Sequence, residues 1–121
     1  MVETYEYYFK KYGYGDFEID GCVINIDAMR VSFRNGDSYL HNKNGPAIIY
    51  KSGQYSWWYN GGRHRLDGPA YVENARSDWY INGKLVTIEI THWAKEQGID
   101  LKNLTEDDKI LIKLAWSDYR G

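Results

Sequence analysis

The sequence predicts an α+β fold, in which an antiparallel meander sheet of β-hairpin repeats carries two C-terminal helices packed on one face. Tyr, Trp and Phe make up 17% of the chain, and aromatic residues are typical of strands. The stretch WWYNGGRHRLDGPA, which begins at Trp57, recurs in part on both sides. The last third of the chain has helix-capping patterns. We expect the 121 residues to form a single domain, 1–121, because a chain of this length builds one core.

The domain is expected to divide into N-terminal strands in 1–30, hairpin repeats in 31–86 and helices in 87–121. The first region is acidic and rich in tyrosine. Its last part, CVINIDAMRVSF, begins at Cys22 and contains β-branched residues in short alternation. Such alternation predicts strands.

The tripeptide Gly-Pro-Ala defines the repeat of the middle region. It occurs at 45–47 and again at 68–70, and aligning the two copies places His41 over His64. A period of roughly 20 to 25 residues indicates a repeat architecture in which each unit is one supersecondary element. Because the two histidines occupy equivalent positions, we expect each to make the same local hydrogen bond, which ties a turn to the neighbouring hairpin.

Asn-Gly pairs identify the repeated element as a β-hairpin. Three of them, at 35–36, 60–61 and 82–83, each follow a short aromatic or branched segment, and the first of these is a weaker copy preceded by Phe33. Asn-Gly favours the tight type I′ turn, which needs positive φ at both central residues. We therefore expect each copy to fold back on itself.

Strand alternation predicts which aromatic rings share a face. Trp57 and Tyr59 should point to one side and Trp58 to the other, whereas in the next copy Trp79 corresponds to Trp57 and Tyr80 to Trp58. Both faces of the sheet therefore carry rings. For any one ring a structural role is favoured over a ligand platform, because buried aromatic rings supply much of a core.

Two helices are predicted in the C-terminal region. The first covers 91–97 and ends at Gly98, a residue that commonly terminates helices. In the second, Thr105 and Asp108 have the spacing of a capping box. Its apolar stripe is expected to pack on the sheet and consists of Leu111, Leu114 and Ala115, widened by Ile110, Ile112 and Trp116.

The units WWYNGGRHRLDGPA and WYINGK resemble divergent MORN-type β-hairpin repeats of tailed bacteriophages and large DNA viruses. The resemblance covers about 31–86, and the ending NLTEDDKILIKLAW is similar to tails of such phage proteins. The first copy has two extra residues before His41, and the third lacks a His-Arg-Asp set. MORN-type repeats act mainly in binding and scaffolding, so the resemblance implies an interaction role without a fixed ligand.

The repeats are the basic part of an acidic chain. Region 31–86 has seven Lys or Arg against four Asp or Glu, although the whole chain has a net charge of -2. Trp, Tyr and Arg are the residues most enriched at binding hot spots. The expected partner-binding residues combine these types in the repeats: Trp57, Trp58, Tyr59, Arg63, Arg65, Trp79 and Tyr80.

Other function classes find little support in the sequence. His41, His64, His92 and Cys22 are the only histidines and cysteine, and they lack the short spacing of a zinc site. We expect no catalytic residues, metal or cofactor, because nucleophile-elbow and phosphate-loop motifs are missing. Neither a membrane-spanning run nor a signal peptide is present, so a cytoplasmic protein is expected.

Three functions remain open from the sequence. The leading hypothesis is a non-enzymatic phage or viral accessory protein that binds, and inhibits, a host protein such as an antiviral defence factor of the kind targeted by anti-CRISPR or anti-restriction proteins. The second is a nucleic-acid or nucleotide binder, because bases stack on basic aromatic sheets. The third is a structural repeat module that self-associates.

Overall fold

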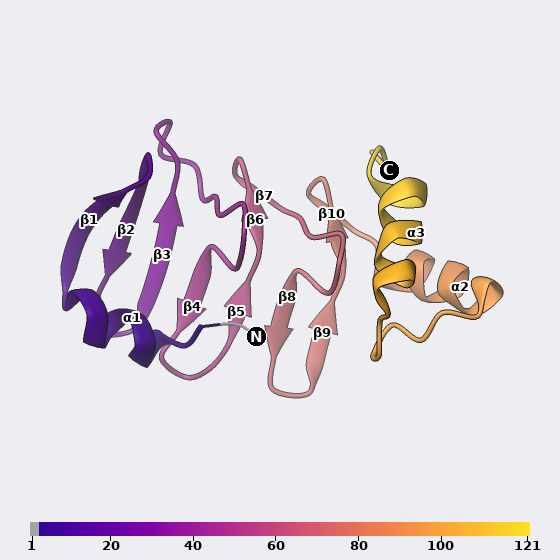
Figure 1. The fold of residues 1–121 in the computed structure, drawn as a ribbon, viewed down its shortest axis with the longest axis horizontal. Helices are drawn as coiled ribbons and strands as arrows, with labels where there is room; N and C mark the ends of the chain where they lie inside the picture. Colours follow the sequence, from indigo (N-terminus) through magenta and orange to yellow (C-terminus); the bar gives the residue numbers. More distant parts are fainter. Residues whose placement is uncertain (1–2) are drawn as a thin grey trace.

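The computed structural model describes residues 3–121 and confirms the predicted α+β class with an antiparallel meander and two C-terminal helices (Figure 1). The large sheet has seven strands. In spatial order they are β1 (Gly15–Ile19), β2 (Cys22–Ile26), β3 (Arg30–Arg34), β4 (Ile48–Tyr50), β5 (Tyr55–Ser56), β8 (Tyr71–Glu73) and β9 (Arg76–Asp78). Each strand pairs antiparallel with its neighbour.

Two further hairpins continue from β5 and β9. The first consists of β6 (Trp58–Tyr59) and β7 (Gly62–Arg63), and the second of β10 (Tyr80–Ile81) and β11 (Lys84–Leu85). Their turns are the Asn-Gly pairs, with φ of 47° and 83° at 60–61 and of 50° and 81° at 82–83. Both predicted hairpins are confirmed, because positive φ at both central residues is the requirement of a type I′ turn.

The pair at 35–36 makes a different turn from the one expected. Positive φ occurs at Ser38, at 67°, and not at Asn35. The Asn35 carbonyl accepts a hydrogen bond from the Ser38 backbone N–H, and an isolated bridge joins Arg34 to Leu40. The extra residues before His41 therefore lengthen this connection into a loop.

The backbone hydrogen bonds repeat from unit to unit. The N–H groups of Phe33 and Trp57 donate to the Ala carbonyls of the two Gly-Pro-Ala segments, at 2.8 and 2.6 Å. The carbonyls of Phe33 and Trp57 in turn accept from the N–H groups of His41 and His64, and the Trp79 carbonyl accepts from Val86. Phe33, Trp57 and Trp79 are thus equivalent positions of one repeated hydrogen-bonding scheme.

A helix, α1 (Tyr5–Tyr12), forms where N-terminal strands were predicted, so the expectation for this segment is wrong. The Thr4 side chain accepts from the Tyr7 N–H and caps the helix. The helix buries Tyr5 against the first strands, and the Tyr8 ring meets Phe33 edge-on at 5.3 Å. Figure 1 shows α1 lying across the sheet beside β1 to β3.

The other two helices, α2 (Thr87–Gln97) and α3 (Glu106–Trp116), lie at the C-terminal end of the array (Figure 1). Gly98 ends α2 in the left-handed conformation, and the helix begins four residues earlier than predicted. The predicted capping box of α3 is present, because Thr105 and Asp108 exchange side-chain to backbone hydrogen bonds.

The prediction of the buried face of α3 is wrong, because the structure buries a different side of the helix. Ile112 and Trp116 are buried, whereas Leu111 and Leu114 are 47% and 78% exposed, and Ile110 and Ala115 are exposed as well. The buried pair packs with Trp79, Ile81, Val86 and Ile90 in a cluster of its own. The two helices therefore close the end of the repeat array, whereas a second core under α1 joins β2, β3 and β4.

Candidate functional site

The repeated histidines join neighbouring turns, as their equivalent positions predict. His41 Nδ1 accepts a hydrogen bond from the Asn60 backbone N–H at 3.0 Å, and His64 Nδ1 accepts one from the Asn82 N–H at 2.8 Å. A neutral imidazole that accepts at Nδ1 carries its proton on Nε2. Burial and the positive charge of Arg120 lower the pKa of His64, which keeps this ring neutral at neutral pH.

Arg63 is enclosed by aromatic rings. Its guanidinium lies 5.2 Å from the Trp58 ring centroid, 4.9 Å from that of Tyr71 and 5.2 Å from that of Tyr80. Arg63 Nη1 also donates to the Tyr80 hydroxyl at 3.3 Å. Trp58 and Tyr80 thus share one side of the hairpins, as alternation predicts, and their rings are committed to holding Arg63.

Arg65 braces the turn of its own repeat. Its guanidinium stacks on Trp57 at 4.1 Å, and Arg65 Nε donates to Asp67 Oδ1 at 2.8 Å. Arg65 Nη1 reaches the Pro69 carbonyl at 3.2 Å. In the preceding copy the equivalent Asn42 side chain donates to the Pro46 carbonyl at 3.0 Å. Two different side chains therefore hold the Gly-Pro-Ala segment in the same way.

We expect Gly68→Ala to lower the free energy of unfolding by about 1–2 kcal/mol, because it displaces the Arg65 guanidinium from its hydrogen bonds and from Trp57. A Cβ at position 68 would lie 2.5 Å from Arg65 Cζ. Chemical denaturation of the variant measures the loss. Gly45→Ala is the matched control, because its Cβ would meet Asn42 Nδ2 at 3.5 Å, an ordinary contact. Equal losses in the two variants would contradict this role of Arg65.

The structure separates the seven predicted partner-binding residues into three groups. Trp79 is 4% exposed and belongs to the C-terminal core, so it offers almost no surface to a partner. Trp58, Arg63 and Tyr80 form the aromatic enclosure described above. Trp57, Tyr59 and Arg65 line one surface hollow together. Of the seven, Tyr59 is the exposed ring, at 47%.

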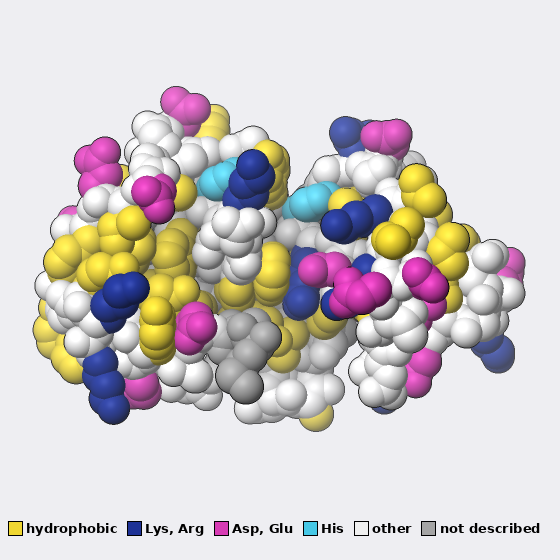
Figure 2. All heavy atoms as spheres, in the orientation of Figure 1, with side chains coloured by type: hydrophobic (Ala, Val, Ile, Leu, Met, Phe, Trp, Pro, Cys, Tyr) yellow, Lys and Arg dark blue, Asp and Glu magenta, His cyan; other side chains and the backbone are white. Residues whose placement is uncertain are grey.

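Two adjoining surface hollows lie around Tyr59. Tyr59 and His64 line both of them. Their volumes are about 230 and 280 Å³. We call them together the Tyr59 groove, lined by Asn42, Lys43, Trp57, Tyr59, Asn60, Gly62, His64, Arg65, Leu66, Asp67, Asn82, Lys113 and Arg120. The Tyr59 ring lies between the two imidazoles, 4.5 Å from His41 and 6.2 Å from His64. Figure 2 shows histidine and Lys or Arg side chains gathered near the tips of the small hairpins.

The groove has an excess of unpaired positive charge. Arg65 is neutralised by Asp67, but Lys43, Lys113 and Arg120 form no ion pair within residues 3–121. Arg120 is held nearby because the Asn82 side chain donates to the carbonyls of Ser117 and Tyr119, at 3.0 and 2.9 Å. The groove is therefore rich in hydrogen-bond donors and suited to an anionic group.

Sequence reasoning missed the contributions of Lys113 and Arg120. Both come from α3 and the segment after it, far along the chain from Tyr59. His64 was identified as a turn residue by its repeated position, but its place beside Tyr59 was not predicted. Only the tertiary packing of the C-terminal helices brings these cations to the repeats.

Two other features, a metal-ligand cluster and a membrane-spanning helix, are not found in the described part of the chain. Residues 3–121 contain no group of three or more His, Cys, Asp or Glu side chains placed to hold a metal ion. None of their helices has the length and apolar character needed to cross a membrane. No protein-family model, curated protein or solved structure matches the chain.

Proposed function

We propose that this chain is a non-enzymatic binding protein whose Tyr59 groove holds an acidic segment of a protein partner. The observation that carries the proposal is the set of three cations, Lys43, Lys113 and Arg120, which have no ion-pair partner among residues 3–121 and lie around an exposed tyrosine. A carboxylate-bearing partner would complement this charge, and exposed tyrosine is a frequent anchor at protein interfaces.

Several parts of the groove also hold the fold together. His41 and His64 fix the two turns on either side of Tyr59, and Asn82 fixes the segment that carries Arg120. Side chains ordered before binding lose less conformational entropy on association. This arrangement therefore favours recognition of a partner with little rearrangement.

The MORN-type resemblance of the repeats extends the proposal to a biological setting. We propose that the chain is a viral accessory protein of the tailed-phage kind that acts in the host cytoplasm. Its partner would be a host protein such as an antiviral defence factor, and occupying an acidic functional surface of that factor would inhibit it. This step depends on the sequence resemblance and not on the geometry of the groove.

The arrangement of rings favours a protein partner over single-stranded nucleic acid. Nucleic acid of that kind binds by stacking successive bases on exposed aromatic rings. Trp58 and Tyr80 are occupied by Arg63, and Trp79 is buried. Tyr59 alone of the predicted rings remains exposed, which provides one stacking position and not a series.

A pull-down from nuclease-treated bacterial lysate, with captured proteins identified by mass spectrometry, tests the proposal. We expect a defined protein to bind the wild-type chain and Tyr59→Ala to weaken that binding by about 30-fold, the loss typical of an interface hot spot. Lys113→Glu should weaken it as well, and by more at low salt, because repulsion replaces attraction.

Lys10→Glu is the matched control for charge, since Lys10 is exposed on α1 at the other end of the array. Binding that survives Lys10→Glu but not Tyr59→Ala or Lys113→Glu would support the groove. Capture from untreated lysate that disappears after nuclease treatment would show that the groove binds nucleic acid. A chain that captures only itself would show self-association, and either result would overturn the proposal.

A further inference from the structure

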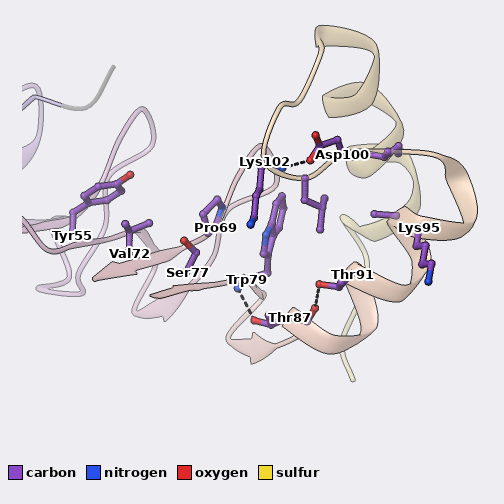
Figure 3. A pocket seen from close by; sticks show the side chains of 13 residues that line it. Tyr55, Pro69, Val72, Ser77, Trp79, Thr87, Thr91, Lys95, Asp100 and Lys102 are labelled. Carbon is purple, nitrogen blue, oxygen red and sulfur yellow. Dashed lines mark hydrogen bonds between the residues drawn. The ribbon is translucent and has the colours of Figure 1, made fainter. Parts of the chain in front are cut away.

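A larger cavity lies on a different part of the molecule, between the end of the sheet and the C-terminal helices (Figure 3). Its volume is about 710 Å³, within the range of small-molecule sites. Strands β5, β8 and β9 contribute one side, and α2 with the connection to α3 contributes the other. The cavity shares no lining residue with the Tyr59 groove.

The floor of the cavity and part of its wall are apolar. Trp79, Ala94 and Ile99 are buried side chains that form its base. Pro69 and Val72 line the side formed by the repeats. A ligand body of carbon and hydrogen would be removed from water here, which is the main favourable contribution to binding in such sites.

Several polar groups of the cavity are already satisfied by the protein. Thr87 Oγ1 accepts from the Trp79 N–H at 2.9 Å, and Thr91 Oγ1 donates to the Thr87 carbonyl. The Asp100 carboxylate accepts from the Lys102 backbone N–H at 3.0 Å and from Asn103 Nδ2 at 3.1 Å. These groups position the walls and leave little hydrogen-bonding capacity for a ligand.

Besides Lys95, three lining donors remain uncommitted within residues 3–121. The Lys102 ammonium, the Ser77 hydroxyl and the Tyr55 hydroxyl line the cavity, and none of them has a hydrogen-bond or ion-pair partner in that part of the chain. Figure 3 shows Lys102 reaching from the α2–α3 connection toward Trp79, whereas the Lys95 side chain points away. One cation and two hydroxyls thus line a space whose buried base is apolar.

From this arrangement we infer that the cavity binds a small molecule with an apolar, ring-sized body and a single carboxylate. The carboxylate pairs with Lys102 and accepts a hydrogen bond from Ser77, and the apolar body lies along Pro69, Val72 and Leu101. One unpaired ammonium matches one negative charge.

A second negative charge on the ligand is disfavoured by Asp100. The hydrogen bonds from Asn103 and from the Lys102 N–H lower the pKa of the Asp100 carboxyl, so it remains charged at neutral pH. Asp100 lines the cavity, so its charge would repel a dianion such as a phosphate monoester more strongly than the single charge of a carboxylate. The site therefore favours a monoanion over a dianion.

Titration of the whole chain with 4-phenylbutyrate and with the neutral 4-phenylbutanol, followed by amide NMR shifts, tests the inference. We expect the carboxylate to shift the amides of Ser77, Trp79 and Lys102 at millimolar concentration or below. The alcohol should bind about 10-fold more weakly, because it has no charge to pair with Lys102.

Lys102→Gln should reduce the affinity for the carboxylate to that for the alcohol and leave the alcohol unchanged. Lys95→Gln is the matched control and should change neither, because Lys95 is likewise an exposed lining residue but its side chain points away from Trp79 (Figure 3). Equal binding of the two probes, shifts elsewhere on the molecule, no shifts at all, or equal effects of the two variants would overturn the inference.

Discussion

Ile112→Ala is expected to lower the free energy of unfolding by about 2–5 kcal/mol, the usual cost of removing a large aliphatic side chain from a packed core. Ile112 is 0% exposed and lies in the cluster that joins α3 to Trp79, Val86 and Ile90. The substitution would leave a cavity between the helix and the last repeat. Urea denaturation followed by tryptophan fluorescence measures the loss.

Leu114→Ala is the control for this prediction, because Leu114 lies on the same helix but is 78% exposed. Its cost should stay within about 0.5 kcal/mol, the range of ordinary surface substitutions. A Leu114→Ala variant as unstable as Ile112→Ala would show that the face predicted from the sequence is buried, and would contradict the packing of α3 described above.

The α3 helix illustrates where pattern reasoning succeeds and fails. Its start was predictable, because the Thr105 and Asp108 capping box is local chemistry that needs no knowledge of the rest of the fold. Its buried face was not, because apolar residues from Ile110 to Trp116 lie nearly all around the helix. When the apolar stripe is that wide, only the neighbouring elements decide which part of it is buried.

The repeats were predictable for a similar reason. Asn-Gly turns act within one hairpin, each histidine reaches only to the turn of the next one, and both recur in phase, so one copy helps to interpret the next. The α1 helix was missed because its tyrosines are typical of strands. Local helix signals were nevertheless present in the Thr4 cap and in the basic residues Lys10 and Lys11 near its end.

The candidate site was predictable only in part, because side chains from distant segments complete it. Sequence reasoning identified Tyr59 and the basic character of the repeats. It also assigned Arg63 and Arg65 to a partner, although each is held by aromatic rings of the protein itself. Part of the basic and aromatic character of the repeats therefore stabilises the fold through cation–π contacts. The order of residues in the sequence does not show which arginine contacts which ring.

At the end of the repeat array a threonine side chain supplies the hydrogen-bond acceptor that a Gly-Pro-Ala segment supplies in earlier repeats. In earlier copies the N–H groups of Phe33 and Trp57 donate to an Ala carbonyl of the next Gly-Pro-Ala segment. No such segment follows Trp79, and its N–H donates instead to Thr87 Oγ1 at 2.9 Å. Thr87 thus begins α2 and at the same time completes the hydrogen bonding of the last repeat.

Thr87→Val is expected to lower the free energy of unfolding by about 1–3 kcal/mol, because it keeps the shape of the side chain and leaves the N–H of buried Trp79 without an acceptor. It also removes the hydrogen bond that Thr87 donates to Asp78 Oδ1. Denaturation curves of this variant and of Thr91→Val measure the difference. Thr91 is exposed and bonds only to the Thr87 carbonyl, so its loss should be much smaller. Similar losses in both variants would mean that the two hydroxyls support only α2, and that the repeat array ends without a substitute acceptor.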